Sequence, residues 1–388
     1  MMRPMKLAGD QLLFGEGTLA HLKAIKAKKA VIVMQSDIMY EIGVMDIVEK
    51  HLQEAKIDFS VFMGFETDPK FSTVLKGAKF MLKEEPDIII AIGGGSAMDA
   101  AKGMWIYYEH PEIKTLDYLM DKSKFPKLRT KARLVCIPTT AGTASEVSRS
   151  IVITDDETDK KYGIGNMEMM PDIAICDPIT TLSLPKSITA QTGMDALCHA
   201  LEAVVSTRSN HLSDMLSEKA ILDVFEYLPQ AIENGKNIKV REKMLTASMV
   251  AGLAFTNVSL GITHSIAHSL GSLFQMPHGL ANAILLPYIV KFNYNNDEAK
   301  TIYDNLAKKL GYDNLVIALV NLNKTIKIPS KLQDIITDEE DFKNKFDTLL
   351  SYSLEDGCTK TNPILPSKTN LKMIINAAYI GKMEAIKL

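Results

Sequence analysis

The amino-acid sequence predicts an α/β domain followed by an all-helical domain. In the first half, short and continuously apolar runs alternate with stretches of helical spacing. The strand signal stops near residue 185, and long amphipathic stretches fill the remainder. The chain has 388 residues, which exceeds the usual size of one hydrophobic core, so two domains are expected. We assign residues 1–185 to the α/β domain and residues 186–388 to the helical domain.

Six apolar runs in the first half predict buried β-strands. Between the first three runs, residues 44–56 and 71–85 carry apolar side chains at helical spacing. Strand–helix–strand order with continuously apolar strands predicts a parallel sheet that is covered on both faces. The predicted strands are 28–37, 57–65, 86–96, 132–140, 150–156 and 171–178.

The second half contains amphipathic stretches that are long enough for helices. Their apolar residues recur at three- and four-residue intervals, which is typical of helices that pack on one face. The predicted helices are 187–206, 212–233, 239–257, 262–274 and a segment near 368–386.

The composition is that of a globular protein, with 46% hydrophobic residues, 23% charged residues and a net charge of −3. We therefore expect no nucleic-acid partner. No run approaches the roughly 18 apolar residues of a membrane helix, so no membrane partner is expected either. The start of the chain has no apolar signal region, and the four cysteines show no CxxC spacing. These features predict a cytoplasmic protein with reduced thiols.

Two turns that follow predicted strands indicate a nucleotide site. Gly94, Gly95 and Ser96 stand between a strand and a helix, where glycine lets backbone N–H groups approach a diphosphate. Their spacing differs from the GxGxxG fingerprint, and a simple tight turn is the alternative. The second turn, PTTAGTASEVS, offers the hydroxyl groups of Thr139, Thr140 and Thr143. Two such turns at the carboxyl edge of one sheet favour a dinucleotide.

Asp37 ends the first predicted strand. A carboxylate there accepts a hydrogen bond from a ribose 2′-hydroxyl and repels a 2′-phosphate, which favours NAD over NADP. The alternative interpretation is a helix N-cap aspartate.

A cluster of histidines in the second half indicates a metal or proton-transfer site. Asp195 and His199 are four residues apart on one predicted helix, and His264 and His268 repeat that spacing on another. His278 follows a proline and is expected on a loop. A single histidine in an apolar segment is more commonly a core residue, but the set together suits a divalent metal. Because His264 and His268 share a helix face, spacing does not decide which of them binds the metal.

Four motifs closely resemble the iron-containing (group III) alcohol dehydrogenases, a family that includes lactaldehyde reductase, propanediol dehydrogenase and butanol dehydrogenase. The resemblance extends from about residue 10 to residue 362 and implies a Rossmann-like N-terminal domain with an all-α C-terminal domain, as in dehydroquinate synthases. The motifs are GGGSAMDAAK (93–102), PTTAGTASEVS (138–148), GMDALCHALE (193–202) and GITHSIAHSLGSLFQMPHGLANAILLP (261–287).

The resemblance also implies roles for individual residues. The implied metal ligands are Asp195, His199, His264 and His278, and His268 is implied near the substrate and the nicotinamide rather than on the metal. Because an imidazole titrates near neutral pH, we expect His268 to relay the hydroxyl proton, and a supporting side chain in the pocket wall is the alternative. The implied cofactor contacts are Asp37, Gly94, Gly95, Ser96, Thr139, Thr140, Thr143 and Lys161. The implied substrate contacts are Ser150, Val152, Phe255, Leu260 and Cys358. Asp68 departs from the family pattern, in which asparagine is common at this position.

The function implied by the resemblance is hydride transfer between NAD(H) and a short, uncharged primary alcohol or diol. Fe²⁺ is the implied metal, with Zn²⁺ as an alternative because the ligand types suit both. A homodimer or larger homo-oligomer is implied, and NADP(H) is the less favoured cofactor. The alternatives are a dehydroquinate synthase-type lyase, for which the motifs supply no basic cluster, a glycerol dehydrogenase-like zinc enzyme, and a non-catalytic metal- or nucleotide-binding protein.

Overall fold

The computed structural model describes residues 4–121, 123–157 and 161–386. The chain divides into two compact units. The first consists of Met1–Leu184 and Gly235–Met249, and the second of Pro185–Asn234 and Val250–Leu388. Residues 235–249, which the sequence prediction assigns to the helical domain, group with the first unit. The Lys239 ammonium lies 3.4 Å from the Glu16 carboxylate, and the Arg241 guanidinium donates to the Leu184 carbonyl oxygen at 3.0 Å.

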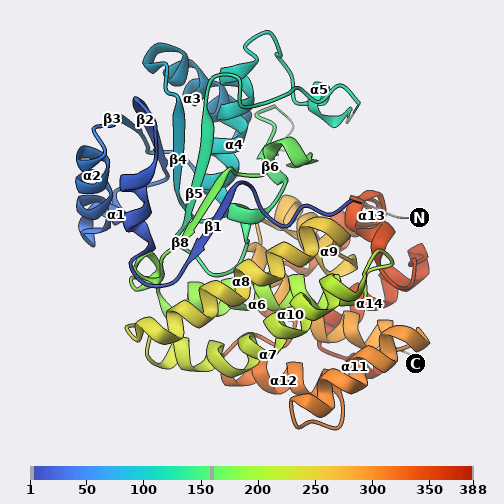
Figure 1. The fold of residues 1–388 in the computed structure, drawn as a ribbon. Helices are drawn as coiled ribbons and strands as arrows, with labels where there is room; N and C mark the ends of the chain where they lie inside the picture. The colour runs from blue at the N-terminus through green and yellow to red at the C-terminus, as the bar shows by residue number, and fades with distance from the viewer. Residues whose placement is uncertain (1–3, 122, 158–160, 387–388) are drawn as a thin grey trace. The chain divides into compact units, whose positions relative to one another are not determined.

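The first unit contains a six-stranded, fully parallel sheet with the strand order β1-β8-β5-β4-β2-β3 (Figure 1). Five of the predicted strands belong to it, which confirms the parallel α/β architecture; the sequence analysis missed β1. The sixth predicted strand, β6 (Ser150–Thr154), instead pairs antiparallel with β7 (Lys161–Gly165) in a separate hairpin. The strands of the large sheet are β1 (Gln11–Phe14), β2 (Lys29–Met34), β3 (Asp58–Phe62), β4 (Ile88–Gly93), β5 (Arg133–Pro138) and β8 (Ile173–Cys176).

Alternate side chains of the central strands enter two separate cores. In β4, Ile89 and Ala91 pack on one face, whereas Ile88, Ile90 and Ile92 pack on the other. Both faces are apolar, which explains why these strands read as continuous hydrophobic runs. The first face is covered by α3 (Phe71–Glu84) and α4 (Gly95–Glu109), and the second by η1 (Thr18–Ala24), α1 (Ile38–Glu41) and α2 (Val44–Glu54).

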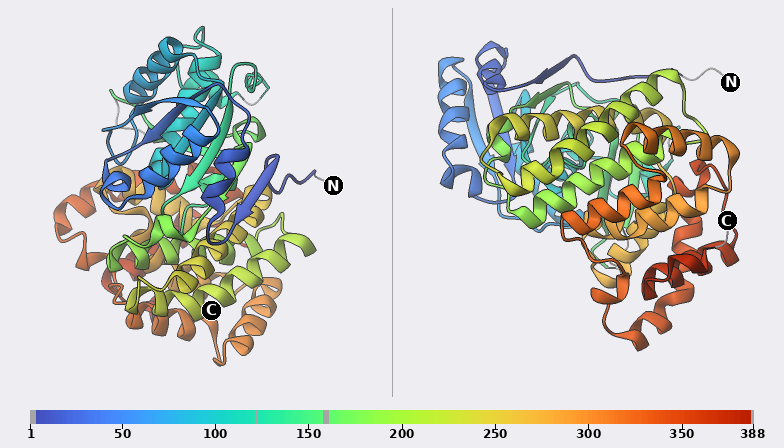
Figure 2. Two further views of the ribbon diagram at one scale, coloured as in Figure 1. Left: turned by 60° about the vertical axis from the view of Figure 1, so that its left-hand side comes forward. Right: turned by 90° about the horizontal axis from the view of Figure 1, so that it is seen from below.

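The second unit is helical, as predicted (Figure 2). Gly193 lies so close to Leu228 that a Cβ on the glycine would stand 2.4 Å from the leucine Cδ1, so α6 and α7 pack tightly. The helices are α6 (Lys186–Val204), α7 (His211–Glu233), α9 (Ile262–Phe274), α10 (His278–Asn293), α11 (Asp297–Lys309), α12 (Leu315–Thr325), α13 (Glu339–Glu355) and α14 (Lys368–Ile380), with α8 (Ile238–Val258) shared between the units.

A sharp turn separates α8 from α9. Ser259 adopts a left-handed backbone with φ of 69°, and the two helices meet at 100°. The turn directs the first N–H groups of α9 toward the Glu202 side chain on α6. Within the described residues, no single helix is both long and apolar enough to cross a membrane, although the bent pair of α8 and α9 together meets that criterion.

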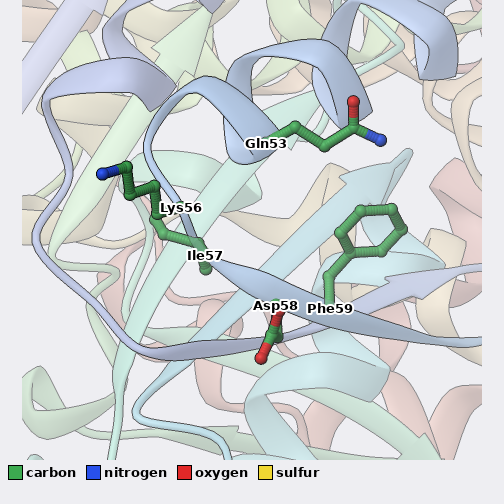
Figure 3. Close-up of a pocket in the computed structure, with 5 residues that line it drawn as sticks. All are labelled: Gln53, Lys56, Ile57, Asp58 and Phe59. Carbon is green, nitrogen blue, oxygen red and sulfur yellow. The ribbon is translucent and has the colours of Figure 1, made fainter.

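A surface hollow in the first unit lies where α2 ends and β3 begins (Figure 3). Its lining residues are Gln53, Lys56, Ile57, Asp58 and Phe59. Because β3 runs parallel to β2 and β4, this hollow lies at the amino end of the strands, whereas the predicted nucleotide turns follow their carboxyl ends. It contains none of the predicted site residues.

Candidate functional site

The two predicted nucleotide turns lie side by side at the carboxyl edge of the sheet. The Thr139 N–H donates to the Gly93 carbonyl oxygen at 2.9 Å. A Cβ on Gly95 would stand 2.8 Å from the Thr143 Cγ2, and one on Gly94 would stand 3.3 Å from the Thr140 Cγ2. Close packing of the two turns therefore requires small residues at both positions.

Polar groups at these turns fit an anionic ligand. The Thr140 hydroxyl is buried and, among the described residues, has no hydrogen-bond partner. Ser96 lies in the first turn of α4, where backbone N–H groups and the helix dipole favour negative charge. A phosphate here would satisfy the Thr140 hydroxyl, so the residues present fit a nucleotide diphosphate.

Asp37 lies at the same edge of the sheet. β2 pairs with β4 in the register Met34↔Ile92, so Asp37 and the glycine turn both follow the carboxyl ends of neighbouring strands. Asp37 is the N-cap residue of α1, but its side chain makes no capping hydrogen bond and is exposed. The structure therefore leaves the carboxylate available to a ligand, contrary to a capping role for the side chain.

The remaining predicted residues of the first unit lie on or beside the hairpin. The Lys161 ammonium donates to the Asp68 carboxylate at 3.0 Å, so the acidic residue that departs from the family pattern pairs with a predicted cofactor contact. Ser150 is exposed at the start of β6, and the Val152 N–H donates to Asp99 at 2.9 Å.

The predicted metal ligands converge in the second unit. The Asp195 Oδ1 lies 3.9 Å from His199 Nε2, 3.7 Å from His264 Nε2 and 3.4 Å from His278 Nε2. Bonds of about 2.1 Å to a tetrahedral ion would place its ligand atoms about 3.4 Å apart. The donor set therefore fits a divalent ion. His278 is not on a loop, as the sequence analysis predicted, but is the first residue of α10, because Pro277 is the helix N-cap.

Burial and neighbouring charges shift the pKa of Asp195 in opposite directions. The residue is 2% exposed. Burial alone would raise the pKa of its carboxyl group, but the neighbouring His199, His278 and His264 rings outweigh burial and hold the pKa well below its usual range. The carboxylate is therefore ionised and able to bind a cation.

Glu202 orients one of the histidines. Its carboxylate lies 2.6 Å from His264 Nδ1 and accepts hydrogen bonds from the N–H groups of Gly261 at 2.8 Å and Thr263 at 2.6 Å. A proton on Nδ1 leaves the Nε2 lone pair directed at Asp195, which is the arrangement that a metal-binding histidine needs. Its position one turn after His199 marks Glu202 in the sequence as a residue that belongs with the histidine cluster, but spacing does not reveal its contact with His264.

His268 takes part in a different contact. Its Nδ1 lies 2.9 Å from an Asp356 carboxylate oxygen, and its ring stacks on His278 at a centroid distance of 5.3 Å. Asp356 was missed, because it lies 88 residues after His268 and leaves no local pattern. Of the predicted substrate residues in this unit, Phe255 stacks on His199 at 4.3 Å, the Cys358 N–H donates to Asp356 at 2.8 Å, and Leu260 is buried between α8 and α9.

Asn282 is a second residue that the sequence analysis missed. Its side-chain Nδ2 lies 2.8 Å from Asp195 Oδ1, 3.2 Å from His264 Nε2 and 3.1 Å from His278 Nε2. Three of the four proposed metal-ligand atoms therefore surround the Asn282 amide group. The i,i+4 spacing from His278 on α10 was the signal that could have identified it.

Comparisons with known proteins agree with this geometry. The model of the "Iron-containing alcohol dehydrogenase" family matches residues 10–178, and that of the "Fe-containing alcohol dehydrogenase family, C-terminal" matches residues 189–379. The NADPH-dependent butanol dehydrogenase of Clostridium saccharobutylicum is 42% identical over 95% of this chain and 96% of its own length. The chain belongs to the iron-containing alcohol dehydrogenase family.

Solved structures of iron-containing alcohol dehydrogenase relatives share the whole fold. A 1,3-propanediol oxidoreductase superposes with a TM-score of 0.89 at 33% identity, covering 97% of this chain and 100% of that one. The sulfoacetaldehyde reductase of Bifidobacterium kashiwanohense, solved in complex with NAD⁺, gives a TM-score of 0.85 at 26% identity, covering 97% and 99% of the two chains. Several aldehyde-alcohol dehydrogenases also match, but the chain covers only 46% of their length.

The predicted family and the predicted combination of a Rossmann-like domain with a helical domain are thus confirmed. As a member of the iron-containing alcohol dehydrogenases, the protein is an oxidoreductase of alcohols and aldehydes.

Proposed function

We propose that the protein interconverts a short, uncharged aldehyde and its primary alcohol or diol with NAD(H), using Fe²⁺ held by Asp195, His199, His264 and His278. The observation that carries this proposal is the convergence of one ionised carboxylate and three imidazole nitrogens beside the His268–Asp356 pair. Asp195, His199 and His264 are buried, and His278 is partly exposed. Zn²⁺ is the alternative metal, because oxygen and imidazole ligands suit both ions.

When bound, the metal would polarise the substrate oxygen as a Lewis acid, and the nicotinamide would supply or accept the hydride. The side chains of this chain have three tasks. Glu202 fixes the His264 tautomer, which keeps the Nε2 lone pair directed into the cluster. Phe255 shields the His199 ring from water. His268 moves the hydroxyl proton, and Asp356 holds its Nδ1–H so that Nε2 is the exchanging atom.

The preference for NAD(H) rests on Asp37. Its exposed carboxylate would accept a hydrogen bond from a ribose 2′-hydroxyl and repel a 2′-phosphate. The related butanol dehydrogenase is named as NADPH-dependent, whereas the related sulfoacetaldehyde reductase was solved with NAD⁺. NADP(H) is therefore the alternative cofactor. Gly94, Gly95, Ser96, Thr139, Thr140 and Thr143 would hold the diphosphate, and Lys161 would contribute through its pair with Asp68.

The substrate class rests on the residues proposed to contact it. Val152, Phe255 and Leu260 are apolar, and Ser150 and Cys358 add only a hydroxyl and a thiol. Butanol and 1,3-propanediol appear in the names of two relatives and belong to the class that such a set would accept. A homodimer or larger assembly and a cytoplasmic location stay predictions.

The test is an anaerobic assay of iron-loaded protein with butyraldehyde and NADH, followed by NADH absorbance. We expect oxidation of NADH that a chelator abolishes, and slower oxidation of NADPH. A zinc-loaded sample is the control for metal identity. If no aldehyde or alcohol supports turnover with either cofactor and either metal, the proposal is wrong, and a lyase of the dehydroquinate synthase type or a binding protein becomes the better interpretation.

A further inference from the structure

Three donor side chains of different chemistry meet beside the proposed metal centre. They are His268 on α9, Asp356 at the N-cap of the short helix η6 (Gly357–Thr361), and Cys358 within that helix. One ligand atom from each lies within 4.8 Å of the other two. The side chains of His268 and Asp356 are 33% and 20% exposed, so an ion in solution can reach them.

Hydrogen bonds already hold the donors in place. Asp356 accepts from the Cys358 N–H at 2.8 Å and from the Ser265 hydroxyl at 3.2 Å, while its other oxygen lies 2.9 Å from His268 Nδ1. Tetrahedral zinc would place its nitrogen and oxygen ligands about 3.4 Å apart. The His268–Asp356 pair therefore has to open only slightly to admit an ion.

A second cluster of possible metal ligands in the same unit is less suited to binding an ion from solution. Cys198, Glu202 and His264 also approach one another, but all three are fully enclosed. Glu202 already accepts two backbone N–H bonds and faces His264 Nδ1. Binding an ion there would remove the contact that orients His264 in the proposed metal centre.

We propose that His268, Asp356 and Cys358 form a second divalent-metal site that takes Zn²⁺ in preference to Fe²⁺, and that zinc in this site inhibits the enzyme. A thiolate makes the site softer than the oxygen and nitrogen set around Asp195, which favours zinc over iron. Three protein ligands and one solvent position form a common zinc geometry. The inhibitory part rests on the proposed function, whereas the binding part does not.

Charge balance permits two ions at close range. Zinc binding releases the Cys358 thiol proton to solvent, and the His268 ring binds through Nδ1 while Nε2 carries its proton. The thiolate and the Asp356 carboxylate then neutralise the added double charge. Asp195 and Glu202 contribute two negative charges around the other centre. With Nδ1 bound to zinc, His268 cannot adopt the tautomer in which Asp356 holds the Nδ1 proton and Nε2 exchanges the substrate proton. Loss of this tautomer is the basis of the proposed inhibition.

Cobalt provides a direct test, because only a thiolate ligand gives a near-ultraviolet sulfur-to-cobalt charge-transfer band. The proposed centre at Asp195 contains no sulfur ligand. Metal-free protein titrated with Co²⁺ should therefore show d–d bands with the first equivalent and the sulfur band with the second. Added Zn²⁺ should bleach the sulfur band first.

Matched variants locate the sulfur. Cys358→Ser should lose the band, whereas Cys198→Ser should keep it, and Asp356→Asn should weaken cobalt binding at least tenfold without removing the thiol. Circular dichroism of each variant confirms folding. The absence of a sulfur band in the wild type, or its loss in Cys198→Ser and retention in Cys358→Ser, would overturn the assignment.

Inhibition is measured separately on protein loaded with one equivalent of Fe²⁺. We expect the zinc concentration for half-inhibition to rise at least tenfold in Cys358→Ser, with each variant compared to its own zinc-free rate. Unchanged zinc inhibition in this variant overturns the inhibitory role. A sulfur band in a protein that turns over no alcohol or aldehyde would support the second site while refuting the proposed function.

Discussion

His264 and His268 lie four residues apart on the same face of α9 but make different contacts. The Nε2 of His264 lies 3.7 Å from Asp195, and its Nδ1 faces the buried Glu202 carboxylate. His268 is half-buried and its Nδ1 faces Asp356. One residue is thus placed to bind the metal and the other to move a proton, a distinction that depends on partners from distant parts of the chain.

Two alanine substitutions separate these roles. His264→Ala should lose bound iron, because it removes one donor and leaves the Glu202 carboxylate buried without its imidazole. His268→Ala should retain iron close to the wild-type content but lower turnover by about 10²- to 10⁴-fold, the usual range for loss of a general acid–base group. Metal content after iron loading and gel filtration, measured alongside turnover, decides between them. Equal loss of iron in both variants would show that the roles of His264 and His268 are assigned wrongly.

At the scale of secondary-structure elements, the start of α4 packs against the turn after β5, so the position of each segment limits that of the other. Gly95 begins α4, and Thr143 approaches the place where its Cβ would be. The separation of the two turns therefore sets the space available to a diphosphate. This contact joins two segments that the sequence analysis identified independently.

Gly95→Ala should raise the KM for NADH by about tenfold, equivalent to about 1.4 kcal/mol of lost cofactor binding, because the new methyl group would stand 2.8 Å from the Thr143 Cγ2. Gly163→Ala on β7 is the matched control, since a Cβ there meets nothing within 4 Å. Steady-state kinetics with both variants provides the measurement. A KM in Gly95→Ala as low as in the control would show that the turns do not hold the cofactor.

The secondary-structure elements that the sequence predicts correctly are those in which burial alone determines the spacing of apolar residues. The strand 86–96 and the helix 262–274 have apolar spacing that their burial explains, and both are present as β4 and α9. β1 was missed because it has only four residues and gains its partner, β8, from more than 150 residues away. Pro277 suggested a loop at His278, yet its backbone suits a helix start. Contacts such as His268–Asp356 arise from tertiary packing and leave no local signal.

At the scale of the whole molecule, the two proposed ligands belong to different compact units. The proposed metal donors all lie in the second unit, whereas the nucleotide turns and Asp37 all lie in the first. A ligand stabilises the part of the chain that binds it, by about 2.7 kcal/mol at one hundred times its Kd. The metal has an added effect in the second unit, because its charge offsets the buried Asp195 and Glu202 carboxylates.

Amide hydrogen exchange should therefore respond to each ligand in a different unit. Adding Fe²⁺ to metal-free protein should slow exchange in peptides from α6, α9 and α10, where the four proposed ligands lie, and leave the β4–α4 and β5 turns nearly unchanged. Adding NADH alone should slow exchange in those turns and have little effect on α9 and α10. His264→Ala is the control for the first response, since it should lose iron-dependent protection while keeping the response to NADH. If iron protects the nucleotide turns as strongly as α9, or if NADH protects only the helical unit, the assignment of the two ligands to separate units is wrong.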